Sequence, residues 1–156
     1  MAPLIVLLTV TVLARLGGHF GITGLRSWRA AVRVGLAMMF CFTAAAHFNS
    51  MRPDLVRMVP PSVPSPALMV TVTGVCEVLG AIGLLVPRLR RAAAIALIAM
   101  LVAVLPANVH AARADATIGG RPATPLIPRV ALQGLFIAAL WWSAGAANAG
   151  RTGRAH

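Results

Sequence analysis

The chain alternates between five apolar stretches and short segments rich in glycine, proline and arginine. The apolar stretches cover about residues 2–16, 30–48, 66–86, 92–110 and 126–147. A helix that crosses a membrane needs about 20 mostly apolar residues, and the last four stretches have about that length. The first is shorter, but Arg15 at its end can extend its side chain to the lipid headgroups. The pattern predicts an all-α, polytopic transmembrane bundle.

The segments between these stretches are short. Residues 17–29 carry glycines, arginines and Trp28, which is typical of an interfacial loop, and residues 111–125 form a polar connection. No connecting segment is long enough to hold a separate active site, so we expect any function inside the bundle or at its edge. We divide the chain into an N-terminal hydrophobic segment with its loop (1–29), the transmembrane bundle (30–148) and a short basic tail (149–156).

Composition supports a membrane protein over a soluble one. The chain is 59% hydrophobic and 11% charged, whereas a soluble domain is typically about 25% charged. Its fourteen arginines face three acids, for a net charge of +11. In a soluble protein this charge would suggest nucleic-acid binding. Here the arginines lie mostly between apolar stretches, where they anchor at lipid headgroups, so we expect the lipid bilayer and no nucleic acid as partner.

The arginines also predict an orientation. Five spans would place nine arginines on one side of the membrane, within residues 15–33, residues 88–91 and the tail, and five on the other side. Arginine-rich loops usually stay in the cytoplasm, which predicts a cytoplasmic C-terminus and an external N-terminus. If the first stretch does not span, the other four keep this orientation.

Glu77 is the strongest candidate for a functional residue. It is the only glutamate in the chain and lies in the middle of the third apolar stretch, about 16 Å from Pro66 along a helix. A charged side chain at the centre of a span costs about 2.5–3.5 kcal/mol, so it normally faces a partner or a cavity. Glycines at 74, 80 and 83 on the same stretch predict close packing against another helix, which would turn Glu77 toward protein.

Several polar residues are expected near the outer end of the same bundle. These are His47, Asn108, His110, Arg129 and Gln133. We expect them to form a polar funnel that ends at Glu77, with Arg129 or His47 as its partner. Such a site would take a small molecule, a quinone or a proton. The alternative is that Glu77 only ties helices together and that the other residues anchor at headgroups.

Other chemistry has less support. Cys41 and Cys76 are predicted at similar depth in neighbouring spans, which would allow a dithiol, although cysteine is also a common small buried residue. The four histidines are scattered and fit no metal site. The chain has no phosphate-binding glycine loop and no nucleophile motif, so we assign no catalytic residue.

The segments that carry these residues resemble the DoxX-like family of small bacterial membrane proteins. The matching pieces are GLAMMFCFTAAAHF at 35–48, MRPDLVRMVPPSVPSPALMV at 51–70, TGVCEVLGAIGLLVPRLRRAAA at 73–94, LPANVHAA at 105–112 and PLIPRVALQGLFIAALWW at 125–142. The resemblance implies a four-helix core, to which the first apolar stretch adds a short N-terminal helix. The positions that carry over are His47, Pro60, Gly74, Glu77, Gly80, Pro87, Pro106, Asn108, Arg129 and Gln133.

The resemblance also implies a setting. Some relatives are subunits of thiosulfate:quinone oxidoreductase, and others are tied to thiol and oxidative-stress handling. We therefore expect a membrane partner in redox or sulfur metabolism of the bacterial cytoplasmic membrane, with a quinone or other small molecule bound at the site. Its protein partner would be a second copy or a redox protein. A non-catalytic scaffold or assembly subunit and a small-solute or proton transporter remain open alternatives.

Overall fold

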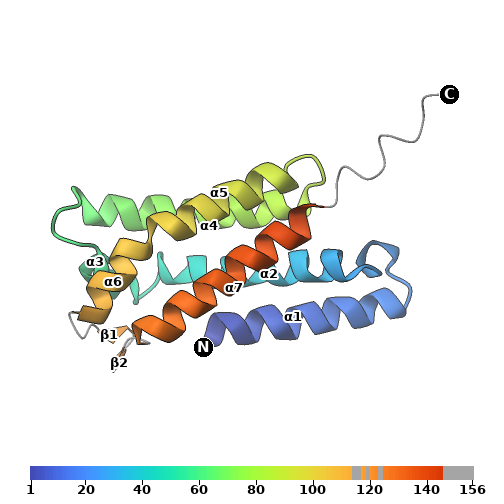
Figure 1. Cartoon of the computed structure of the whole chain (residues 1–156), viewed down its shortest axis with the longest axis horizontal. Coiled ribbons are helices and arrows are strands. Elements are labelled where there is room, and N and C mark those ends of the chain that lie inside the picture. The colour runs from blue at the N-terminus through green and yellow to red at the C-terminus, as the bar shows by residue number, and fades with distance from the viewer. Residues whose placement is uncertain (114–116, 119, 123–124, 146–156) are drawn as a thin grey trace.

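The computed structural model describes residues 1–113, 117–118, 120–122 and 125–145. These residues form an all-α bundle, as the sequence predicts (Figure 1). Its elements are, in chain order, α1 (Ala2–His19), the 3-10 turn η1 (Thr23–Leu25), α2 (Trp28–Ala46), α3 (Arg52–Met58), α4 (Pro66–Leu85), α5 (Arg90–Ala103), α6 (Leu105–Arg113) and α7 (Leu126–Ala144). Between α6 and α7, the two-residue strands β1 (Thr117–Ile118) and β2 (Arg121–Pro122) pair antiparallel.

The helix α2 lies at the centre of the bundle and packs against α1, α4 and α7, while α5 packs against α4 and α7. Its Leu36, Met39 and Phe40 are buried together with Leu84 of α4 and Leu140 of α7. Lipid offers no hydrogen-bond partners to the backbone. The apolar stretches therefore fold as helices, in which the N–H and C=O groups of one segment pair with each other.

Three glycines set how closely the helices approach. A Cβ atom at Gly35 of α2 would collide with Thr11 and Leu7 of α1. A Cβ at Gly74 of α4 would lie 2.6 Å from His47 Cβ, and one at Gly80 would lie 2.5 Å from Leu97 of α5. The predicted close packing through the glycines of α4 is therefore confirmed.

The fourth apolar stretch differs from the prediction of one continuous helix. It consists of α5 and α6, which are separated at Val104. Pro106 has no N–H for the carbonyl four residues earlier, and its ring would clash there in a continuous helix. A run of apolar residues gives no sign of such a break, because hydropathy does not register a missing backbone donor.

The connections also differ from the prediction in two places. The segment after α2, expected to be a loop, contains the short helix α3, which begins at Arg52 with Pro53 in its first turn. The expected loop 17–29 is shorter, because α1 extends to His19 and α2 already begins at Trp28. Ser27 starts α2 by accepting a hydrogen bond from the Ala30 N–H at 3.1 Å. Residues 146–148, at the end of the expected bundle, lie outside the described residues.

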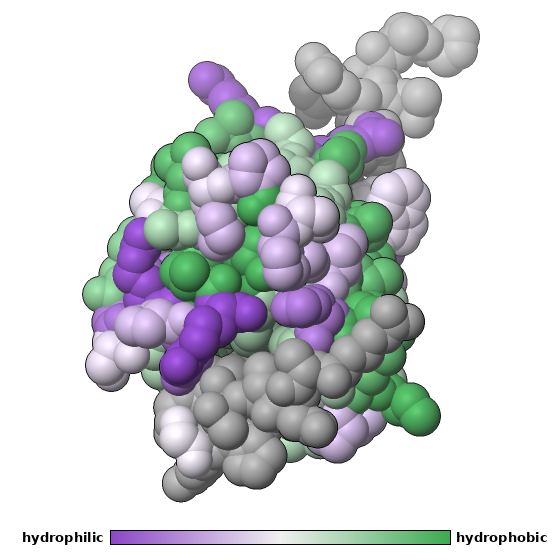
Figure 2. Space-filling model, turned by 90° about the vertical axis from the view of Figure 1, so that its left-hand side faces the viewer, coloured by the Kyte–Doolittle hydropathy of each residue, from purple (hydrophilic) through white to green (hydrophobic). Residues whose placement is uncertain are grey.

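Among the described residues, five segments are long and apolar enough to cross a membrane: α1, α2, α4, α5 with α6, and α7. Their outward faces expose large apolar side chains such as Leu79, Ile82 and Ile95, as expected where lipid surrounds the protein. The two ends of the bundle differ. One end holds α3, α6 and the β1–β2 pair (Figure 1), and Figure 2, which faces this end, shows hydrophilic residues gathered on it. The α1–α2 and α4–α5 connections lie at the other end.

Candidate functional site between α2 and α4

Four polar side chains face one another where α2 and α4 pack side by side. Thr43 of α2 and His47, the C-cap residue of α2, lie four residues apart, and Thr73 and Glu77 lie one turn apart on α4. Because the two helices run in opposite directions, Thr43 meets Glu77 and His47 meets Thr73. Thr43 Oγ1 lies 2.9 Å from Glu77 Oε2, and Thr73 Oγ1 lies 3.3 Å from His47 Nδ1. We call these four residues the polar cluster.

His47 is held in one orientation. Its Nδ1 lies 2.7 Å from the carbonyl oxygen of Val70, and since a carbonyl only accepts, Nδ1 carries the proton. The lone pair of the neutral ring is then on Nε2, which lies 3.8 Å from Glu77 Oε2. Burial lowers the pKa of His47 below its ordinary value, and the charge of Arg52 lowers it further against the opposing effect of the Val70 bond. The imidazole is therefore kept neutral.

Glu77 can be satisfied with or without its proton. The Thr43 hydroxyl lies 2.9 Å from Glu77 Oε2 and 3.1 Å from the carbonyl oxygen of Phe40. Thr43 donates to the carboxylate when Glu77 is ionised. When Glu77 is protonated, its O–H can donate to Thr43 Oγ1, whose own proton then goes to Phe40. Oε2 of Glu77 keeps Thr43 as its partner in both states, so proton exchange at Glu77 need not disrupt this contact between α2 and α4.

Three residues of the polar cluster lie on the wall of a cavity of about 340 Å³, which we call the Glu77 pocket. His47, Thr73 and Glu77 contribute to its lining, as does Asn108 of α6. Apolar residues of α3, α4, α5, α6 and the proline-rich link form the rest. The side chains of Glu77 and His47 are only 12% and 14% exposed. A mostly apolar pocket with a few convergent polar groups is the usual form of a small-molecule site.

The remaining predicted site residues are less direct neighbours of Glu77. Arg129 donates from Nη1 to Asn108 Oδ1 at 3.0 Å, so it holds a residue of the pocket lining but is not part of that lining. Of the two partners expected for Glu77, the structure places His47 beside it. Asn108 and His47 share the pocket with Glu77, whereas Gln133 and His110 lie outside its lining.

Gln133 has a backbone partner instead. It is buried, and its Nε2 donates to the carbonyl of Leu101 in the last turn of α5. The last carbonyls of a helix lack partners within it, and here α5 ends early because of the break at Val104. The amide of Gln133 thus stabilises the broken helix, whose residues Val104 and Pro106 line the Glu77 pocket.

Sequence reasoning missed Thr43 and Thr73. Both are a turn away from a predicted site residue, at 43 and 47 on one helix and at 73 and 77 on another, and this spacing is the signal that could have found them. Arg52 was also missed. It donates to the His47 carbonyl at 3.1 Å and to Thr71 Oγ1 at 2.9 Å, and so joins the start of α3 to both helices of the site.

The cysteines lie apart from this site. Cys41 and Cys76 are both free and exposed on the outside of their helices. Within the described part of the chain, no three His, Cys, Asp or Glu side chains are grouped closely enough to hold a metal ion.

Fold and site together define the class: a polytopic, all-α membrane protein with a small-molecule-sized pocket around a carboxyl group in a span. The chain belongs to the family described as a domain of unknown function, DUF8561, whose model matches residues 36–144. The match runs from α2 to the end of α7 and leaves α1 outside. Searches of curated proteins and of solved structures gave no significant match.

Proposed function

We propose that this protein binds a quinone, or another small molecule of similar size, in the Glu77 pocket, as a membrane partner in redox or sulfur metabolism. The observation that carries the proposal is the pairing of Glu77 with His47, 3.8 Å apart on the wall of an otherwise mostly apolar cavity. A quinone has an apolar ring with carbonyl oxygens that accept hydrogen bonds, and this fits a protonated carboxyl group in an apolar pocket. The redox or sulfur setting is what the DoxX-like resemblance implies.

In this proposal the two side chains have different roles. Protonated Glu77 donates a hydrogen bond to an oxygen of the ligand and can exchange a proton with it. His47 Nε2 carries a lone pair and faces Glu77, so it can accept that proton or a hydrogen bond from a hydroxyl form of the ligand. The distance of 3.8 Å between Nε2 and Oε2 is too long for a direct hydrogen bond and leaves room for one ligand atom in contact with both.

The proposed setting is the bacterial cytoplasmic membrane with the C-terminus in the cytoplasm. Support comes from the nine arginines predicted on one side of the bundle. In this orientation the α4–α5 turn is cytoplasmic and the Glu77 pocket lies in the outer half of the bundle, beneath α3 and α6. A protein partner, whether a second copy or a redox protein, would then dock outside the pocket.

A second candidate function is that of a structural subunit. The bonds from Thr43 to Glu77 and from His47 to Val70 both join α2 to α4, so the same residues would serve a scaffold without any ligand. The two candidates differ in what the conservative change Glu77→Gln does. It keeps a hydrogen-bonding group beside Thr43 but removes the exchangeable proton.

The deciding experiment is quinone retention after purification in a mild detergent, followed by titration with a short-chain quinone. We expect the wild type to retain quinone and both Glu77→Gln and Val63→Trp to lose it while remaining folded, because Val63 lines the pocket. Val75→Trp, on the exposed face of α4, is the matched control and should bind normally. Arg129→Ala should weaken binding less than Glu77→Gln does. No quinone in any protein, with Glu77→Gln unfolded, would favour the scaffold.

A further inference from the structure

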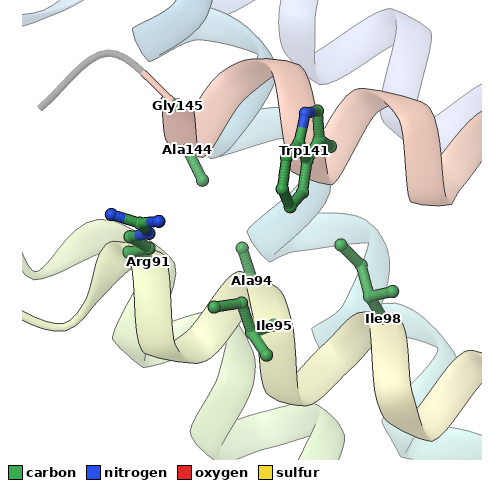
Figure 3. Close-up of a pocket in the computed structure, with 7 residues that line it drawn as sticks. All are labelled: Arg91, Ala94, Ile95, Ile98, Trp141, Ala144 and Gly145. Carbon is green, nitrogen blue, oxygen red and sulfur yellow. The ribbon is translucent and has the colours of Figure 1, made fainter.

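A second cavity lies at the opposite end of the bundle, between α5 and α7. It has a volume of about 260 Å³ and is lined by Arg91, Ala94, Ile95, Ile98, Trp141, Ala144 and Gly145. Figure 3 shows Arg91 at one end of it, near Ala144 and Gly145, with Trp141 and Ile98 further along the two helices. We call this cavity the Arg91 groove.

The groove has a floor of small residues and walls of large ones. Ala94 and Ala144 are buried, and their methyl groups leave the space between the helices open. Ile95 and Trp141 are 52% and 69% exposed, so the groove lies on the outer surface of the bundle, where lipid surrounds it. On α5, residues 91, 94, 95 and 98 lie on one face, and 91 to 98 spans about 10 Å. The groove is thus an apolar track with one cation at its end.

Arginines dominate this end of the bundle, and their contacts are not with carboxylates. Arg15 lies over the ring of Trp28, and Arg29 lies over that of Trp142. Arg33 donates from Nη1 to the carbonyl of Ser143 at 2.8 Å, which covers the carbonyl end of α7. The end is therefore a cluster of like charges held by aromatic faces and a carbonyl.

The acids of the described residues lie elsewhere. Asp54 pairs with Arg57 in α3, and Glu77 bonds Thr43 in the middle of α4. An anion that pairs with Arg91 or its neighbours would therefore come from outside the described residues. The N-terminal end of α5 also attracts an anion. Its first N–H groups carry partial positive charge, and Leu89, its N-cap, offers no side-chain acceptor.

We propose that the Arg91 groove binds an anionic phospholipid, with the phosphate at Arg91 and the first part of one acyl chain along Ile95, Ile98 and Trp141. The positive charge of Arg91 attracts the negatively charged headgroup, and the apolar side chains of the groove contact the acyl chain. Basic pockets between transmembrane helices on the cytoplasmic side commonly take such headgroups. Trp141 lies in the last turn of α7, and tryptophans near the ends of spans commonly meet the lipid headgroups. This lipid site is independent of the Glu77 pocket and of its proposed ligand.

The test uses the fluorescence of Trp141 in the full-length protein, in nanodiscs that contain phosphatidylglycerol or phosphatidylcholine with one brominated acyl chain. The changes Trp28→Phe and Trp142→Phe leave Trp141 as the only tryptophan. We expect brominated phosphatidylglycerol to quench Trp141 at a low mole fraction, with saturation, and brominated phosphatidylcholine to need a higher fraction. Arg91→Gln should weaken the phosphatidylglycerol effect about fivefold, because one arginine near the surface contributes about 1 kcal/mol to binding of anionic lipid.

The matched control is Arg26→Gln. It removes an arginine from the α1–α2 connection at the same end of the bundle but does not touch the groove. Arg26→Gln should leave the quenching nearly unchanged. Equal quenching by the two lipids, or equal effects of Arg91→Gln and Arg26→Gln, would overturn the proposal. Displacement by inorganic phosphate would assign the site to a free anion, and a signal that followed protein concentration would assign it to a second copy; both would also overturn it.

Discussion

The Glu77 pocket and the Arg91 groove have similar volumes and largely apolar linings, yet they treat charge in opposite ways. In the pocket, the carboxyl group of Glu77 and the imidazole of His47 are nearly buried, and each has a hydrogen-bond partner on the other helix. In the groove, the single ionisable group, Arg91, is exposed at one end. The pocket is therefore suited to a neutral ligand that exchanges hydrogen bonds or protons, and the groove to an anion.

The closeness of helix packing explains why the ionisable groups are buried in the pocket but exposed in the groove. At the pocket, Gly74 lets α4 approach His47 so closely that a Cβ atom at 74 would lie 2.6 Å from His47 Cβ. At the groove, the described part of the chain has no atom within 4 Å of the place where a Cβ at Gly145 would be, apart from the chain neighbours of Gly145 and the backbone of its own helix. Buried polar groups need close, fixed partners, because an unpaired one costs about 1–3 kcal/mol. An exposed arginine has no such requirement, so the groove can remain open.

The largest expected effect comes from adding one methyl group at each site. Gly74→Ala should destabilise the protein by about 1–3 kcal/mol and displace His47, because the added atom has no space. Gly145→Ala should change stability by less than about 0.5 kcal/mol. Thermal unfolding in detergent, together with quinone titration, measures both. Equal tolerance at the two positions would mean that the pocket is as loosely packed as the groove and would remove the basis of the comparison.

A smaller effect is expected at two polar residues of α7. Gln133 donates to the Leu101 carbonyl of another helix, whereas Ser143 donates to Leu140 within its own helix, at 3.2 Å. Gln133→Leu should cost about 1 kcal/mol, a typical value for a hydrogen bond between transmembrane helices. Ser143→Ala should cost less. In a Pro106→Ala background, which restores the missing backbone donor near the break, the cost of Gln133→Leu should shrink. An unchanged cost would show that the break is not what Gln133 supports.

The sequence was sufficient to predict the helices and to predict that Glu77 faces protein. Apolar stretches marked the spans, and Gly74, Gly80 and Gly83 indicated the packed face of α4. It was not sufficient for the break at Val104, because the effect of Pro106 on the backbone depends on whether a partner such as Gln133 is at hand. Nor could it decide between Arg129 and His47 as the neighbour of Glu77. A long, flexible arginine can reach several partners, and the choice of Asn108 depends on where α6 lies after the break.

The site also turned out less polar than the predicted funnel. The sequence placed polar residues at similar depth but could not show that α3 and the proline-rich link add apolar side chains such as Leu55, Met58 and Val63 to the same cavity. Thr43 and Thr73 were overlooked because threonine is common in apolar helices and attracts notice only once its neighbour one turn away is known to be functional. Depth along a span can be counted from a sequence, but what closes the space around a site cannot.

The smallest expected effect concerns the charge of His47. This charge decides whether the pocket, unlike the groove, lacks a positively charged side chain. Its pKa is lowered from the ordinary value of 6.5, first by burial and then by the charge of Arg52. An unfolded chain would take up a proton at His47 near pH 6.5, whereas the folded protein does so only at lower pH. The contribution of His47 to stability is therefore complete above pH 6.5 and is lost as the pH falls through the pKa of the folded state.

Nitrogen NMR of labelled histidine should show a neutral ring with the proton on Nδ1 at pH 6.5. Arg52→Gln should raise the pKa, and His47→Gln should abolish this part of the pH dependence of unfolding. A His47 that is already a cation above pH 6.5 would place a positive charge in both cavities, and the pocket would then be expected to select an anion as the groove does.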